Sequence, residues 1–165
     1  MTPELPAEPL VVRRLREQLP DALLGVETFR DELTLRVRPG AVVEVCRLLK
    51  QDPDLQYNFF ADLCAVDFPG RERRFEVVYN LFSLPYARRV RLKVELGEGE
   101  RIPSITGLWC GADWHEREAY DDFGVVFDGH PDLRRIRNPE DFNGHPMRKD
   151  YPVQDMPKWW EEGRP

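Results

Sequence analysis

The sequence predicts an α+β fold in which helices pack on one face of a mostly antiparallel β-sheet. Segments with apolar residues at helical spacing are interspersed with segments in which apolar and polar residues alternate, in the order αββαβββα. The 165 residues are 41% apolar and 33% charged, which is long enough and apolar enough for one buried core. We therefore expect an α+β domain over residues 1–124 and an irregular C-terminal extension over residues 125–165.

The first half of the predicted domain contains two helices and two strands. Apolar residues at helical spacing predict a helix over residues 11–19, which a proline ends. Residues 21–29 are strand-like, and residues 32–38 alternate cleanly between apolar and polar side chains. Apolar residues at i, i+3, i+4 and i+7 predict a second helix over residues 42–49, which an Asp-Pro pair ends.

Three further strands and one helix complete the predicted domain. Residues 63–68, 75–81 and 90–96 have apolar residues at every second position. The polar face of the last of these strands is mostly basic, which is expected where that face meets water or a partner. Residues 102–107 are predicted to form a loop, and residues 111–122 a short acidic helix.

The predicted extension combines irregular structure with many aromatic residues. It is rich in Gly, Pro, Asn, Asp and Arg and has no long periodic segment. Its aromatic residues are too numerous for a solvated tail, and they are Phe127, Phe142, Tyr151, Trp159 and Trp160. We therefore expect the extension to lie across a surface, either that of its own domain or that of a neighbour.

The charge and cysteine content exclude several classes of protein. There are 24 basic and 30 acidic residues, and a net charge of −6 argues against nonspecific binding to nucleic acid or anionic lipid. No apolar run reaches the roughly 18 residues of a membrane span, and the N-terminus lacks the features of a secretion signal. We expect a soluble, cytosolic chain without a direct membrane span. Cys46, Cys64 and Cys110 form no Cys-x-x-Cys pair, so we expect buried structural thiols rather than a zinc or iron–sulfur site.

The densest polar cluster lies on the predicted acidic helix. Glu116 shares one helix face with two alanines and Phe123, so its carboxylate is buried if that face meets the core. A buried carboxylate must find a cation or become protonated, and we expect Arg134 or Arg135 to fold back and pair with it. An inter-subunit contact and acid–base catalysis are the alternatives. Arg117 is predicted to pair on the surface with aspartates four residues away.

Three histidines stand fifteen residues apart, at His115, His130 and His145. This spacing suggests a metal site, but the latter two lie in Gly-His-Pro turns, where they are expected to hydrogen-bond the backbone. The pattern His-Glu-x-x-His is absent, as are the glycine-rich nucleotide-binding motifs and the Gly-x-Ser-x-Gly motif of hydrolases. No catalytic, cofactor-binding or metal-binding residue is predicted, and the chain is not expected to act as an independent enzyme.

Two consecutive motifs resemble a known family. Residues 116–124 read Glu-Arg-Glu-Ala-Tyr-Asp-Asp-Phe-Gly, and residues 130–136 read His-Pro-Asp-Leu-Arg-Arg-Ile. Together they closely resemble the signature of the thirty-kilodalton subunit family (the C subunit) of proton-pumping NADH:quinone oxidoreductase, respiratory complex I. Matching segments continue to residue 152 and begin near residue 60, and the signature is too long and irregular for chance agreement.

This resemblance implies a cofactor-free structural subunit of the hydrophilic arm of complex I. Such a subunit supports electron transfer from NADH through iron–sulfur centres to quinone, coupled to proton translocation. The implied partners are the large subunit of the quinone cavity and nearby iron–sulfur subunits, and the implied location is peripheral, on the cytoplasmic side of the cell inner membrane. The family motif marks these residues as interface or ion-pair positions: Glu116, Arg117, Glu118, Tyr120, Asp121, Phe123, Gly124, His130, Arg134, Arg135, His145, Arg148, Lys149 and Tyr151.

The resemblance leads to a hypothesis for the extension. We expect residues 125–160 to dock on the quinone-cavity subunit, with Arg134, Arg135 and Arg148 either meeting acidic groups there or bracing the extension on Glu116. One alternative is the equivalent subunit of a membrane-bound hydrogenase or of a quinone oxidoreductase with another electron donor. An alternative from another class is a free-standing metal-dependent hydrolase that uses His115, Glu116 and His130.

Overall fold

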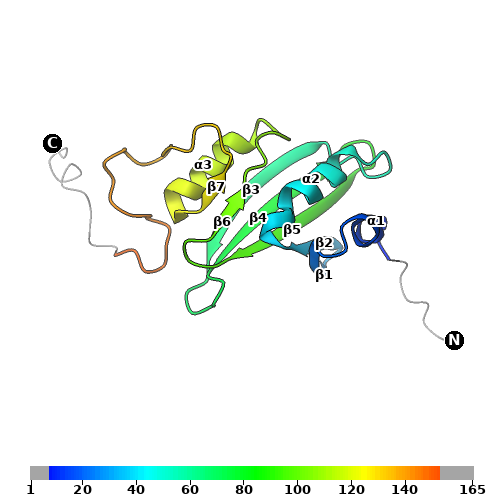
Figure 1. Ribbon diagram of the computed structural model, residues 1–165, viewed down its shortest axis with the longest axis horizontal. Coiled ribbons are helices and arrows are strands. Elements are labelled where there is room, and N and C mark those ends of the chain that lie inside the picture. Colours follow the sequence, from blue (N-terminus) through cyan, green and yellow to red (C-terminus); the bar gives the residue numbers. More distant parts are fainter. Residues whose placement is uncertain (1–7, 153–165) are drawn as a thin grey trace.

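The computed structural model describes residues 8–152 and contains a five-stranded sheet with the strand order β1–β2–β5–β4–β3 (Figure 1). The strands are β1 (Leu23–Phe29), β2 (Glu32–Val37), β3 (Phe59–Asp67), β4 (Phe75–Ser83) and β5 (Arg88–Leu96). Neighbouring strands run antiparallel except β2 and β5, which pair in parallel. The predicted α+β fold with a mostly antiparallel sheet is confirmed.

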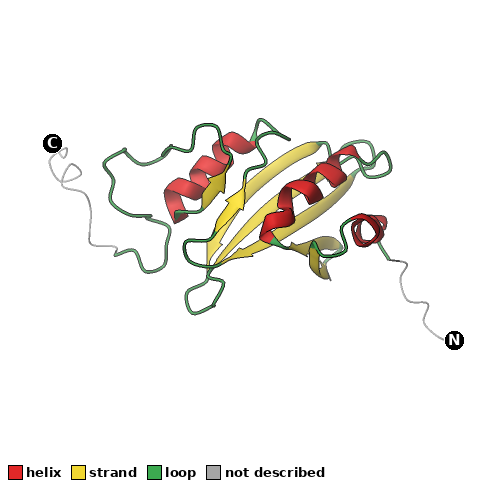
Figure 2. Ribbon diagram, viewed as in Figure 1, coloured by secondary structure: helices red, strands yellow, loops and turns green. Residues whose placement is uncertain are grey.

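Among the described residues, three helices accompany the sheet: α1 (Leu10–Gln18), α2 (Val42–Gln51) and α3 (Ala112–Phe123). A short 3₁₀ turn, η1 (Pro39–Ala41), leads into α2. Figure 2 shows α2 lying across the sheet and α3 at its far end. The buried apolar residues of all three helices belong to one core cluster, so the helices pack around a single core.

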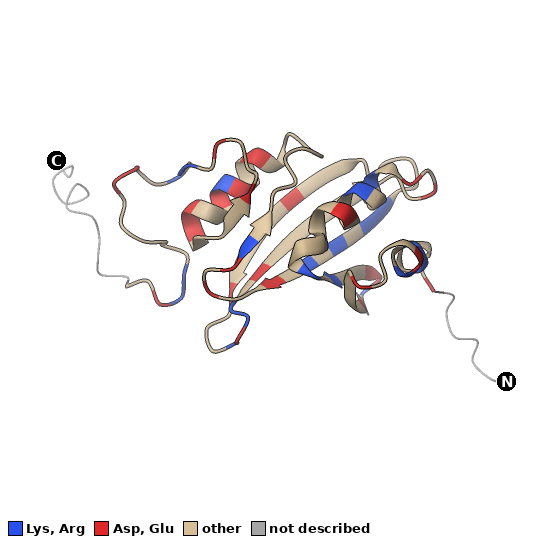
Figure 3. Ribbon diagram, viewed as in Figure 1, with Lys and Arg blue, Asp and Glu red and all other residues tan. Residues whose placement is uncertain are grey.

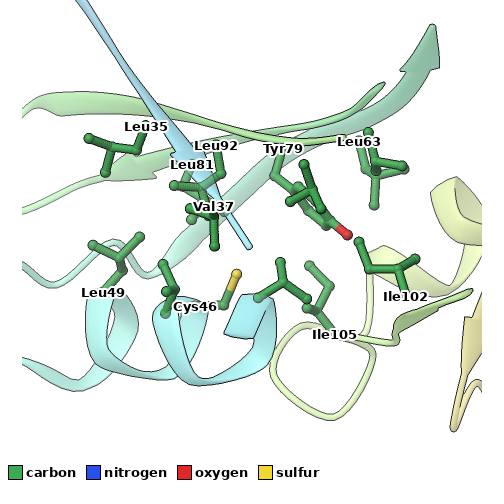
Figure 4. Close-up of a cluster of buried hydrophobic side chains, with 14 of the residues drawn as sticks. Leu35, Val37, Cys46, Leu49, Leu63, Tyr79, Leu81, Leu92, Ile102 and Ile105 are labelled. Carbon is green, nitrogen blue, oxygen red and sulfur yellow. The ribbon is translucent and has the colours of Figure 1, made fainter. Parts of the chain in front are cut away.

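The core fills the space between the sheet and α2 (Figure 4). Because side chains alternate along a strand, the apolar residues at every second position of β2, β3, β4 and β5 point to the α2 side. Phe59 and Phe82, which pair across β3 and β4, lie on the opposite face. The core side chains labelled in Figure 4 are Leu35, Val37, Cys46, Leu49, Leu63, Tyr79, Leu81, Leu92, Ile102 and Ile105. The opposite face of the sheet carries the basic residues of β5, as the alternating sequence predicted.

Two short strands were not predicted. Residues Arg101–Pro103 form β6, where a loop was expected, and pair in parallel with β7 (Val126–Asp128). Ile102 and Phe127 are buried in the core, so the irregular extension starts at Gly129 rather than at residue 125. Three-residue strands are too short to produce a recognisable alternation, which explains the difference.

Two other predictions require correction. Strand β3 begins at Phe59, before the predicted start at residue 63. The pairing register shifts between Phe60 and Asp62, and this irregularity interrupts the alternation of apolar and polar residues from which the start was predicted. Only Cys46 is a buried thiol, whereas Cys64 and Cys110 are exposed. Cys64 lies on the open face of β3, and Cys110 lies in the turn before α3. None of the helices described is long and apolar enough to span a membrane.

Candidate functional site

The most highly connected side chain of the family motif is Asp121, which is fully buried near the end of α3. Its carboxylate accepts five hydrogen bonds from the segment that folds back onto the helix. Three come from the backbone N–H groups of Ile136, Arg137 and Asn138, at 3.0, 2.8 and 2.9 Å. The other two come from Nη1 of Arg135 at 2.6 Å and Nδ2 of Asn138 at 3.0 Å. Asp121 therefore anchors the extension to α3.

The charge state of Asp121 follows from these contacts. Burial alone would raise the pKa of this carboxyl group, but the hydrogen bonds from Asn138, Arg135 and Arg137 outweigh it and hold the pKa well below its ordinary value. The carboxylate is therefore ionised and has its hydrogen-bonding capacity filled by the protein itself. Such a group suits a structural anchor rather than an acid–base catalyst.

Gly124 ends α3 in the left-handed conformation, with a φ of +78°. A Cβ atom at this position would lie 2.6 Å from Nε2 of His145 and 2.7 Å from Nη2 of Arg148. Nδ1 of His145 lies 2.9 Å from the carbonyl oxygen of Asp121, and Nε of Arg148 donates to the carbonyl of Phe123 at 2.6 Å. The glycine thus lets residues 145–148 close over the C-terminal end of the helix, where a cation is also favourable for the helix dipole.

A second anchor joins the extension to the ends of β3 and β4. The buried carboxylate of Asp67 accepts two hydrogen bonds from Arg74, at 2.7 and 2.8 Å, and one from the backbone N–H of Lys149 at 2.8 Å. Nη1 of Arg74 also donates to Asp150 at 2.9 Å. The hydrogen bonds from Arg74 lower the pKa of both Asp67 and Asp150. Residues 149–150 are therefore fixed to the sheet through a shared arginine.

Between the two anchors the extension packs on itself. The ring of Tyr151 stacks on Phe142 with 5.9 Å between centroids, and its hydroxyl donates to the carbonyl of Asn143 at 3.2 Å. A Cβ atom on Gly144 would lie 2.8 Å from the Tyr151 ring. Nη2 of Arg135 donates to the carbonyl of Gly144 at 2.9 Å, which links this turn to the Asp121 anchor.

Glu116 is fully buried, as predicted, but it has no arginine partner among residues 8–152. Its Oε1 accepts the backbone N–H of Ile105 at 2.8 Å, and its Oε2 has no hydrogen-bond partner in the same range. Arg135 pairs instead with Asp121, and Arg134 with its neighbour Asp132. The predicted pairing was wrong because Glu116 and Asp121 are five residues apart, so they point to different sides of α3. Burial raises the pKa of Glu116, and the carboxyl group is stabilised in its neutral form.

Arg117 is buried rather than on the surface. Its Nε and Nη2 donate to the carbonyls of Arg134 and Arg135, each at 3.2 Å, and its guanidinium lies 5.2 Å from the ring centroid of Trp114. The predicted pair with Asp113 is present, with 3.9 Å between Nη1 of Arg117 and Oδ1 of Asp113, but Arg117 is not on the surface because the extension covers this side of α3. Glu118 lies closer to solvent and accepts from Nη1 of Arg137 at 2.7 Å.

The three histidines occupy separate environments. Nδ1 of His115 lies 3.2 Å from Oδ1 of Asp62, and Nε2 of His130 lies 3.2 Å from the carbonyl oxygen of Asp113. The interpretation of His130 and His145 as turn histidines next to backbone groups is confirmed. In the described part of the chain, no three His, Cys, Asp or Glu residues gather closely enough to hold a metal ion.

Comparison with known proteins identifies the family. Residues 35–157 match the family described as respiratory-chain NADH dehydrogenase, 30 Kd subunit. The chain is 54% identical over 144 residues to the NADH-quinone oxidoreductase C subunit of Roseiflexus sp. (strain RS-1), a match that covers 87% of this chain and 83% of the relative. The chain belongs to this family. The corresponding C subunit of Geotalea uraniireducens (strain Rf4) is 46% identical over 154 residues, or 93% of each chain.

Both anchors of the extension lie inside the segment that matches the 30 Kd subunit family. A solved structure of the membrane-bound sulfane sulfur reductase, an archaeal respiratory membrane complex, contains a chain with a similar fold. The TM-score is 0.71, with 24% identity, 92% of this chain covered and 88% of that chain covered. The fold is therefore shared with this second respiratory complex.

Sequence reasoning missed two contributors to the anchors of this family member, Asn138 and Arg74. An asparagine before a proline favours a turn, which was the available signal for Asn138. Asp67 ends β3, and Arg74 comes directly before β4, on the other side of the turn that joins these two strands. Their position across this turn could have suggested the ion pair between them. Nothing local to residues 149–150 indicated that they would join this pair.

Proposed function

We propose that this chain acts as the thirty-kilodalton subunit of an NADH-quinone oxidoreductase. In this role it supports electron transfer from NADH through iron–sulfur centres to quinone, coupled to proton translocation, as a peripheral part of a hetero-oligomeric, membrane-associated complex. The observation that carries the proposal is 54% identity across 87% of the chain to a relative named as that enzyme's C subunit.

The geometry supports a structural role within the complex. The polar residues of the family motif are engaged inside the chain: Asp121 anchors residues 135–138, and Arg148 caps α3 and meets Glu98 at 2.8 Å. A catalytic centre would instead need reactive groups that converge on a site open to substrate. We therefore propose that the motif shapes a docking surface and contributes no redox chemistry of its own.

The outer side of the extension is the proposed docking surface. Arg135 and Arg148 point inward, so of the three arginines that the sequence predicts at this surface only Arg134 is available, with 63% of its side chain exposed. Trp114 and Met147 are also exposed, by 62% and 49%. Tryptophan and arginine are the residues that most often dominate binding at interfaces. We propose that this surface meets the quinone-cavity subunit and iron–sulfur subunits on the cytoplasmic side of the membrane; Trp159 and Trp160, expected to take part, lie outside the described residues.

Affinity purification tests the proposed function. The full chain, expressed with a tag in its own cells, is recovered from a mild detergent extract, and its partners are identified by mass spectrometry. We expect iron–sulfur, flavoprotein and integral-membrane subunits of NADH-quinone oxidoreductase in stoichiometric amounts. Recovery of the chain by itself, or with turnover of its own, would contradict the proposal.

The similarity in fold to a chain of the sulfane sulfur reductase supports a second candidate, the equivalent subunit of a related respiratory complex with another electron donor. The same purification distinguishes the two. An NADH-binding flavoprotein among the recovered subunits supports membership of the NADH enzyme, whereas its absence from an otherwise complete complex supports the second candidate.

A further inference from the structure

The open face of the sheet contains a groove that the proposed docking surface does not include. It lies where β4 and β5 join, and it has a volume of about 590 Å³. Apolar side chains line it, including Leu33, Phe59, Phe82 and Leu84. Phe59 and Leu84 are 50% and 61% exposed, which is unusual for large apolar residues gathered in one place.

The charges on this face are unevenly neutralised. Basic residues recur along β5, as Figure 3 shows in blue. Two of them are paired: Lys93 meets Glu76 at 2.8 Å, and Arg91 meets Glu32 at 2.7 Å inside the groove, which both of these residues line.

At the start of β5, two further basic residues are not neutralised. Within residues 8–152, neither Arg88 nor Arg89 has a carboxylate partner, and both are exposed. Their guanidinium groups lie over the rings of Tyr86 and Phe82, at 5.6 and 5.8 Å from the centroids. In a chain with a net charge of −6, this unpaired positive charge is thus concentrated beside an apolar groove.

A second hollow continues the groove. It has a volume of about 620 Å³, shares Leu33 and Arg89 with the first, and is also lined by Arg88. It extends to the start of α1, where Leu10 contributes. Arg88 and Arg89 are consecutive on β5, so their side chains leave the strand on opposite faces. Arg89 lies in the first hollow with Phe82, and Arg88 lies in the second, which Asp31 also lines. The two hollows together therefore form a trough that passes over the start of β5, with one unpaired arginine in each half.

We propose that this trough binds an extended acidic segment of a partner subunit in the same complex. An apolar side chain of the segment would lie against Phe59, Phe82 and Leu84, and its carboxylates would meet Arg88 and Arg89. Charge complementarity selects this occupant, because arginines already held over aromatic rings form hydrogen bonds to carboxylates with little loss of conformational freedom. The inference rests on the proposed function, since it takes the partner from that assembly.

Site-specific photo-crosslinking in the assembled complex identifies the occupant. A photoreactive amino acid replaces Leu84 in the trough or, as a control, Leu24, a similarly exposed leucine on β1. We expect the probe at position 84 to capture a peptide of another subunit in which Asp and Glu outnumber Lys and Arg, and the probe at position 24 not to capture that peptide. Capture of a neutral or basic peptide, of a lipid or of a second copy of this chain would overturn the inference, as would no capture within a complete complex.

Charge reversal tests the arginines directly. We expect R88E/R89E to reduce the chain retained in the purified complex by roughly tenfold or more, because like charges placed against each other weaken an interface strongly. R71E is the matched control, since Arg71 is also exposed, lies over an aromatic ring and has no carboxylate partner in the described chain. Thermal unfolding of the free variants confirms that both fold.

A charge swap completes the test. Replacing the captured acidic residues by lysine should restore retention of R88E/R89E. Normal retention of R88E/R89E in a complete complex would overturn the trough as a binding site while leaving the proposed function intact. Failure of the wild-type chain to co-purify with any redox subunit would instead contradict the proposed function.

Discussion

At the scale of single residues, Asp121 and Glu116 show that one helix buries two carboxyl groups whose pKa values shift in opposite directions. Asp121 is ionised, since five donors surround it. Glu116 has one donor and, within the described residues, an unpartnered oxygen, so its neutral form is favoured. The difference lies in what each face of α3 meets, which is the polar backbone of the extension for Asp121 and the apolar core for Glu116.

Asp121→Asn is expected to destabilise the chain strongly. The amide carries no charge, and its NH₂ group cannot accept a hydrogen bond. Arg135 or some of the backbone N–H groups of residues 136–138 would therefore lose their acceptor. Breaking one side of a buried, charged network typically costs about 3–5 kcal/mol in the free energy of unfolding, and denaturant titration measures it. Asp132→Asn is the control because Asp132 pairs with Arg134 on the surface, and about 0.5 kcal/mol or less is expected there. Equal stability of the two variants would contradict the anchoring role of Asp121.

Glu116→Gln is expected to be tolerated and to change how stability depends on pH. Burial raises the pKa of Glu116 in the folded chain above its ordinary value of 4.5. The protonated carboxyl group therefore contributes fully to the free energy of unfolding below pH 4.5, and this contribution is lost as the pH rises through the folded pKa. Glutamine has no proton to lose, so the variant should gain stability relative to the wild type as the pH rises above 4.5. Unfolding titrations at several pH values measure the difference. A difference in stability between Glu116→Gln and the wild type that stays constant across these pH values would argue against a raised pKa of Glu116.

At the scale of elements, the end of α3 depends on the close approach of the extension to Gly124. Gly124→Ala is expected to cost more than Gly129→Ala, although both glycines have a φ near +80°. Gly129 has open space around its Cβ position, so its substitution carries only the backbone cost of about 1 kcal/mol. At Gly124 the methyl group also collides with His145 and Arg148, which adds about 1–3 kcal/mol. Denaturant unfolding compares the two, and limited proteolysis should cut residues 129–152 faster only in Gly124→Ala.

Elements with a sustained period were predictable from the sequence, and contacts between distant segments were not. The apolar positions of α2 recur at helical spacing, and those of β2 and β5 at strand spacing, so each element follows from local residues. The anchors of the extension join residues far apart, for example Asp67 and Lys149, which are separated by 82 positions. Periodicity contains no information about such pairs. The same limit explains why Arg135 was assigned to Glu116, since only the path of the chain decides which carboxylate it reaches.

At the scale of the whole molecule, the two anchors fix residues 129–152 along one end of the fold, beside α3 (Figure 1). The inward side of this segment is already satisfied by hydrogen bonds, so the outward side is what remains for a partner. The proposed docking surface and the trough lie on different elements, α3 with the extension for the first and the open sheet face for the second. A protein with two separate contact surfaces can join neighbours to each other, which suits a structural member of a large assembly.

Arg134→Glu is therefore expected to separate folding from assembly. Its guanidinium contacts only the exposed Asp132 among the described acidic side chains, so charge reversal should leave the unfolding midpoint of the free chain nearly unchanged. In cells, the variant should weaken incorporation into the complex, because Arg134 is exposed and its carbonyl meets Arg117, which lies over the exposed Trp114, and arginine and tryptophan often dominate binding at interfaces. Native gel electrophoresis of membrane extracts measures the incorporated fraction. Arg101→Glu is the matched control, since Arg101 is 58% exposed and also pairs with one exposed aspartate. If Arg134→Glu assembles as well as Arg101→Glu, the partner must contact the chain elsewhere, and the outer side of the extension is not its docking surface.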